Sequence, residues 1–68
     1  MTCTDFATEV EYIHYMRKQD VPRVVIEQAH ETGGTYFNRD AIEKAFEMPE
    51  GWNGARVRVA VDEECEGL

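Results

Sequence analysis

The segment Ala55-Arg56-Val57-Arg58-Val59-Ala60-Val61 carries the main signal for the fold class of this chain. Its valines occupy every second position, and arginines occupy two of the positions next to them. Successive side chains of a strand point to opposite faces of a sheet, so this alternation is typical of a half-buried strand. The turn signal Gly51-Trp52-Asn53-Gly54 comes directly before it. We therefore predict a C-terminal strand over residues 55–61.

The N-terminal residues predict a helix instead. Between Asp5 and Lys18, apolar side chains recur at helical spacing, namely Phe6, Val10, Ile13 and Met16. Thr4 or Asp5 is a suitable N-cap for this helix. The helix should end at residues 19–22, because the residue before a proline is disfavoured in the α region.

The segment 21–31 admits two interpretations. As a helix it is capped by Asp20, ends at Gly33 in the left-handed conformation, and carries one apolar face of Val21, Val24, Val25 and Ala29. As a strand, Val24-Val25-Ile26 pairs with Thr35-Tyr36-Phe37 across a turn at residues 31–34. The length of the segment and the glycine at its end favour the helix.

A third helix is expected after the N-cap Asn38 and before Met48-Pro49. Its apolar face consists of Ala41, Ile42, Ala45 and Phe46. Together these elements predict a single α+β domain over residues 1–68, in which two to three helices pack on a short sheet that includes the C-terminal strand. Residues 62–68 form an acidic tail that we expect to fray. The strand needs a pairing partner, either within the chain or in a second copy, which would give a homodimer.

Charge restricts the choice of partners. The chain of 68 residues has 14 acidic and 7 basic side chains, a formal net charge of −7 and a pI of about 4.6. Such a field attracts basic surfaces and repels phosphate backbones. The hydrophobic fraction of 43% is that of a folding chain, and no apolar run approaches the roughly 20 residues of a membrane span. Because residues 1–6 lack the features of a secretory signal, we expect a cytoplasmic protein.

The residues that could support catalysis or metal binding do not form a recognisable motif. The sequence contains no serine, and Cys3 with His14 or His30 has no rigid positioning, so we expect no enzymatic activity. Cys3, His14, His30 and Cys65 lack the closely spaced pairs of a zinc site, and we expect no metal and no cofactor. In a reducing cytosol, two free thiols are favoured over a bond between Cys3 and Cys65.

Direct DNA binding is an alternative suggested by the order of the elements. Helices followed by a strand outline a winged-helix domain, with residues 38–47 as the recognition helix. In that helix the acids Asp40, Glu43 and Glu47 outnumber Arg39 and Lys44, which opposes contact with phosphates. A small helix-turn-helix or winged-helix regulator therefore remains the second choice.

The candidate partner-binding residues are mostly acidic. Glu27 and Glu31, like Glu43 and Glu47, are four residues apart, so a helix displays each pair on one face, and Glu50 follows the second pair. Two aromatic residues join them: Tyr15 lies off the apolar stripe of its helix, and Trp52 lies in the turn. Regularly spaced negative charge on a rigid body can imitate nucleic-acid phosphates and occupy a basic groove.

In size and charge, though in no motif, the chain resembles the small phage-encoded inhibitors of bacterial defence, the anti-CRISPR proteins. The resemblance implies stoichiometric binding to a host protein or nucleoprotein complex, often at its site for DNA. We therefore predict a non-enzymatic inhibitor that blocks a basic nucleic-acid-binding surface, without binding nucleic acid or membrane itself. A further alternative is an accessory subunit whose edge strand completes the sheet of a partner.

Overall fold

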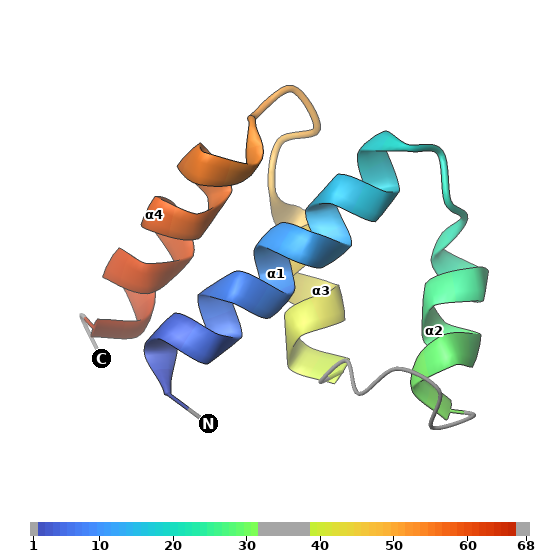
Figure 1. Cartoon of the computed structure of the whole chain (residues 1–68), viewed down its shortest axis with the longest axis horizontal. Coiled ribbons are helices and arrows are strands. Elements are labelled where there is room, and N and C mark those ends of the chain that lie inside the picture. Colours follow the sequence, from blue (N-terminus) through green and yellow to red (C-terminus); the bar gives the residue numbers. More distant parts are fainter. Residues whose placement is uncertain (1, 32–38, 67–68) are drawn as a thin grey trace.

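All regular structure in the described part of the chain is helical. The computed structural model describes residues 2–31 and 39–66, which form α1 (Cys3–Lys18), α2 (Arg23–Glu31), α3 (Arg39–Glu47) and α4 (Gly54–Glu66). In Figure 1, α1 crosses the centre in front of α3, while α4 and α2 lie on opposite sides of it. The predicted α+β fold is therefore wrong, and the described residues form an all-helical domain.

Helix α1 confirms the N-terminal helix and begins two residues before the predicted one. The hydroxyl of Thr2, not Thr4 or Asp5, is the N-cap and accepts a hydrogen bond from the Asp5 amide at 3.1 Å. Asp5 in the first turn and the basic residues in the last turn each carry a charge opposite to that of the nearby end of the helix dipole, which stabilises the helix.

Asp20 follows the C-cap Gln19 of α1 and takes part in terminating that helix, and it does not cap α2. Its φ of 63° is left-handed, which aspartate tolerates better than most residues. The amides of Asp20 and Val21 then donate to the carbonyls of Arg17 and Met16, at 3.1 and 3.2 Å. This pair of bonds is the Schellman motif, which satisfies carbonyls left open at a helix end.

Helix α2 confirms the helical interpretation of residues 21–31, but not the apolar face that we predicted for it. Ile26 is the buried side chain, whereas Val24 and Val25 are exposed to solvent. Arg23 stands 5.1 Å from the ring centre of Phe46 and so links α2 to α3. The interpretations that rested on Gly33, residues 35–37 and Asn38 concern positions outside the described residues.

Helix α4 replaces the predicted strand 55–61. The side chain of Asn53 accepts a hydrogen bond from the Arg56 amide at 2.8 Å, so the residues taken for a turn form a helix N-cap. Val57 and Val61 are 0% and 1% exposed, whereas Val59 between them is 56% exposed. Valines at i and i+4 share one face of a helix, which is why the alternating pattern also fits α4. A homodimer or partner complex formed through this segment as a strand loses its basis.

The core lies mainly between α1, α3 and α4, and α2 adds Ile26 to it. Its fully buried apolar side chains are Ala7, Val10, Ile13, Ile26, Ala41, Ile42, Ala45, Val57 and Val61. Phe6 and Met16 of the predicted α1 stripe, and Phe46 of α3, pack on it while partly exposed. The Cα extents of 32 × 27 × 14 Å describe a flat body, in which so small a core benefits from a covalent tie.

A disulfide supplies that tie. Cys3 at the start of α1 is bonded to Cys65 near the end of α4, with the Cα atoms 5.8 Å apart. The prediction of two free thiols is therefore wrong. Figure 1 shows the ends of α1 and α4 side by side, which brings the two cysteines together across 62 residues of sequence. Residues 62–66, which we expected to fray, continue α4 as far as Glu66.

Candidate functional site

The basic side chains of α1 hold the segment that joins α3 to α4. The Arg17 guanidinium donates to the carbonyls of Ala45 and Met48 at 2.8 and 2.7 Å, and it also lies 5.5 Å from the ring centre of Phe46. These carbonyls belong to the C-terminal end of α3, where a positive charge is favourable. The Lys18 ammonium donates to the Trp52 carbonyl at 3.2 Å. Both cations thus act within the fold.

The same holds for the basic residues of the other helices, with one exception. Arg23 pairs with Glu27 at 2.8 Å, Arg58 with Glu11 at 3.8 Å, and the Arg56 guanidinium lies 4.3 Å from the ring centre of Trp52. Arg39, at the start of α3, is the exposed basic side chain that has no such contact with the described residues. Most of the basic side chains are therefore engaged by groups of the fold, although Lys18, Arg23, Arg56 and Arg58 are themselves exposed at the surface.

Lys44 on α3 bridges two acids. Its ammonium donates to Glu64 of α4 at 2.6 Å and lies 3.3 Å from Glu47. The hydrogen bond to Glu64 raises the pKa of Lys44 above its usual 10.5, and this effect exceeds the lowering caused by desolvation. The ammonium thus connects α3 to α4 and stays charged at neutral pH.

The solvent side of α3 is acidic. Asp40, Glu43 and Glu47 recur at i, i+3 and i+7, opposite the buried Ala41, Ile42 and Ala45, and all three are exposed. We call these three residues the α3 acidic face. Glu50 is exposed just beyond the helix. Glu43 and Glu50 form no ion pair with any described residue.

The predicted site residues fall into separate places. Glu43, Glu47 and Glu50 lie together on and after α3, whereas Glu27 lies on α2 and is paired with Arg23. The side chain of Glu31 is outside the described part. Tyr15 is 59% exposed on α1. Their role in binding a partner stays a prediction.

Trp52 is half-buried, and part of its role is to stabilise the fold. Its ring packs on the core, and its carbonyl accepts the hydrogen bond of His14, whose Nε2 is 2.7 Å away. Because a carbonyl only accepts, Nε2 carries the proton, and the buried Nδ1 has no hydrogen-bond partner among the described residues. His14 is fully buried and fastens the segment before α4 to α1.

Cys3 is considered above as a nucleophile and as a metal ligand, and the structure bears on both roles. Cys3 is bonded to Cys65, so in this state it offers no thiolate as a nucleophile or metal ligand. Across residues 2–31 and 39–66, no three His, Cys, Asp or Glu side chains are grouped so that they could hold a metal ion. No helix in the same residues is long and apolar enough to cross a membrane.

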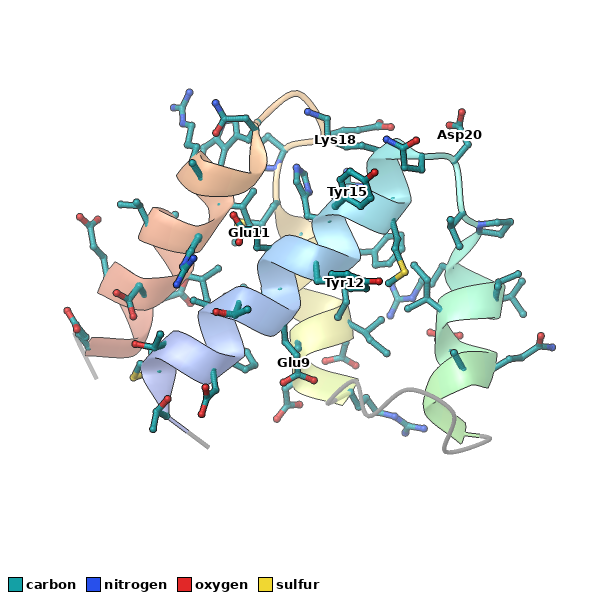
Figure 2. All side chains as sticks on the ribbon, in the orientation of Figure 1. Glu9, Glu11, Tyr12, Tyr15, Lys18 and Asp20 are labelled. Atoms are coloured by element: carbon teal, nitrogen blue, oxygen red, sulfur yellow. A yellow bond between two sulfur atoms is a disulfide. The ribbon has the colours of Figure 1, made fainter. Side chains whose placement is uncertain are left out.

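A groove on α1 is the feature that sequence reasoning missed. It encloses about 500 Å³ beside the N-terminal end of α4 and is lined by Thr8, Glu11, Tyr12, His14, Tyr15, Lys18, Gln19, Asn53 and Gly54. In Figure 2, Tyr12 and Tyr15 project from α1, and Glu11 points toward α4. The sequence pattern that could have indicated the groove is the spacing of Tyr12 and Tyr15, which places both tyrosines outside the apolar stripe of α1.

These features define a small acidic helical domain, closed by a disulfide, with an acidic helix face and a tyrosine-lined groove. No protein-family model, curated protein sequence or solved structure matches the chain.

Proposed function

We propose that this protein acts by binding, without turnover, to a basic nucleic-acid-binding surface of a partner protein, which it blocks with the α3 acidic face. The observation that carries the proposal is the unequal use of charge. Six of the seven basic side chains make contacts within the fold, whereas the α3 acidic face points to solvent. The chain as a whole keeps a net charge of −7, and within the face Glu43 forms no ion pair with the described residues.

The spacing of the α3 acidic face supports mimicry of a nucleic-acid strand. With a rise of about 1.5 Å per residue, Asp40 and Glu47 are separated by about 10 Å along the helix axis. A strand of DNA carries one phosphate per about 3.4 Å, hence about three charges over the same length. The three carboxylates of the face therefore offer a similar linear charge density, reduced where Lys44 lies beside Glu47.

The proposed partner follows from the resemblance in size and charge to phage-encoded inhibitors of bacterial defence. It is a nuclease or nucleoprotein complex of an infected bacterium, which places the activity in the cytoplasm. Disulfides persist mainly in oxidising compartments, so the Cys3–Cys65 bond argues against a reducing cytoplasm, and the cytoplasmic location stays a prediction. The acidic face does not include either cysteine.

A DNA-binding regulator receives less support from the same residues. A winged-helix domain needs strands for its wing, and the described residues contain none. On α3, the candidate recognition helix, Lys44 is engaged by Glu64, so Arg39 is left to meet phosphates beside three acids. We therefore do not propose direct DNA binding.

The test is capture of the partner from bacterial lysate, followed by affinity measurements on the identified protein. The double variant Glu43→Lys and Glu50→Lys reverses one carboxylate of the α3 acidic face and the exposed carboxylate just beyond the helix, neither of which forms an ion pair with a described residue. Its matched control, Glu63→Lys and Glu66→Lys, makes the same charge change at exposed positions of α4. We expect the first variant to bind at least tenfold more weakly and the control to lose much less.

Two further readouts complete this test. Wild-type binding should weaken steeply as salt rises, since exposed charges are screened, and the polyanion heparin should compete. Equal affinity of the two double variants, each folded by circular dichroism, would exclude binding at Glu43 and Glu50 and so contradict the proposed role of the α3 acidic face.

A further inference from the structure

Two exposed tyrosines border the groove on α1. Tyr12 and Tyr15 are 55% and 59% exposed, and they lie on the same side of the helix because they are three residues apart. The ring of Tyr15 makes no aromatic or hydrogen-bonded contact with the described residues. Tyrosine is enriched at protein interfaces because it combines a large apolar ring with a polar hydroxyl.

A carboxylate lies inside this groove. Glu11 extends toward the first residue of α4, where a Cβ on Gly54 would stand 3.1 Å from the Glu11 Cγ. The missing side chain at Gly54 therefore leaves the room that Glu11 occupies. Its Oε1 is 3.8 Å from Arg58, a long ion pair, and the side chain is 31% exposed. The carboxylate thus keeps capacity to accept further hydrogen bonds from a ligand.

The other charged side chain that lines the groove is Lys18. Its ammonium donates a hydrogen bond to the carbonyl of Trp52, in the segment before α4. A ligand beside Tyr15 and Glu11 therefore meets aromatic faces and a carboxylate, in a molecule with a net charge of −7. This combination favours a cation.

We propose that the groove receives an arginine side chain from the basic partner, with its guanidinium stacked on Tyr15 and donating hydrogen bonds to Glu11. The planar guanidinium suits both contacts, because it stacks on aromatic rings and pairs with carboxylates. The fold uses the same chemistry internally, where Arg56 lies 4.3 Å from the Trp52 ring centre and Arg23 lies 5.1 Å from that of Phe46.

This inference rests on the proposed function, because the arginine belongs to the basic surface that the protein is proposed to block. It adds a specific contact on α1 to the general attraction of the α3 acidic face. An arginine anchor in the groove would fix the orientation of the partner, which long-range attraction alone does not do.

The test is a nuclear magnetic resonance titration of the isotope-labelled, disulfide-bonded protein with the peptide acetyl-Arg-Gly-Arg-Gly-Arg-amide. The control peptide has citrulline in place of each arginine, which keeps the shape and removes the charge. We expect the arginine peptide to shift the amide signals of residues 8–19, 53 and 54, and the citrulline peptide to shift them much less.

Variants then identify the contacts. Tyr15→Ala should weaken binding of the arginine peptide about two- to fivefold, whereas Tyr15→Phe, which keeps the ring, should bind like the wild type. Glu11→Gln should weaken binding by a similar factor. Asp5→Asn removes an exposed charge from α1 outside the groove and should have less effect. Tyr15 is exposed, so its variants should fold normally, which thermal melts will check.

The outcomes separate this inference from the function on which it rests. Peptide-induced shifts confined to α3, with Tyr15→Ala binding like the wild type, would overturn the groove inference and leave the α3 acidic face as the binding surface. Equal binding of the citrulline peptide, or no shift at millimolar peptide, would also overturn it. The proposed function fails in a different measurement, if the partner binds the Glu43→Lys and Glu50→Lys variant as tightly as the control variant.

Discussion

Reduction of the Cys3–Cys65 bond should remove a large part of the stability of this domain. The bond joins residues that are 62 positions apart, and loop-closure entropy for a loop of that size corresponds to about 4 kcal/mol at 25 °C. A domain of this length has a net stability of roughly 3–10 kcal/mol. For small domains, each kcal/mol shifts the melting temperature by about 4–8 °C, so reduction should lower it by roughly 15–30 °C.

The measurement is a thermal melt followed by far-ultraviolet circular dichroism, with and without a phosphine reductant. The chain has two cysteines, so the reductant opens no other disulfide. The double variant Cys3→Ser and Cys65→Ser should melt like the reduced wild type and should not respond to the reductant. A difference below about 5 °C between oxidised and reduced protein would refute the reasoning, because it corresponds to about 1 kcal/mol or less.

Two further predictions concern the buried valines of α4 and the ion pair of Lys44 on α3 with Glu64 on α4. Val57→Ala, which leaves a cavity in the core, should cost about 2 kcal/mol in the free energy of unfolding measured by urea titration, whereas Val59→Ala at an exposed position should change it by less than about 0.5 kcal/mol. Similar losses for both would contradict the helical register, because a strand places both valines on one face. Lys44→Met should lower stability at about pH 7 by up to about 1 kcal/mol. The folded pKa of Lys44 is raised, so its contribution is complete below the unfolded value of 10.5 and is lost as the pH rises through the folded pKa. Urea midpoints of wild type and variant should therefore converge as the pH rises through the folded pKa of Lys44, and a constant difference would refute this role of Lys44.

The helices before residue 50 were largely predictable from local pattern. The apolar stripe of α1, the break near Pro22 and the apolar face of α3 all appear in the fold as expected. In each case the helical period was met at several positions and the ends carried capping or breaking residues, so no other local structure competed. In α2 the element was correct, but the burial of Ile26 rather than Val24 depends on how α2 meets the rest of the domain.

The candidate site was less predictable, because it depends on which acidic side chains the lysines and arginines contact in the fold. The exposure of Glu43 and Glu47 follows from their spacing opposite the apolar face of α3. By contrast, the capture of Lys44 by Glu64 joins residues 20 positions apart, and no local pattern indicates it. The groove of Tyr15 and Glu11 likewise requires α4 to begin beside α1.

The charge balance, helices α1 and α3 and the acidic spacing of α3 are properties of neighbouring residues, and the linear order of the chain was enough to predict them. For α2 the sequence favoured a helix but left a strand open. The helical state of residues 55–61 and the Cys3–Cys65 bond needed the assembled domain. Val57 and Val61 satisfy both a strand and a helix, and the N-cap Asn53, the packing of α4 on α1 and the disulfide together favour the helix. Contacts between distant residues decide between two local structures when the local preference for either is small.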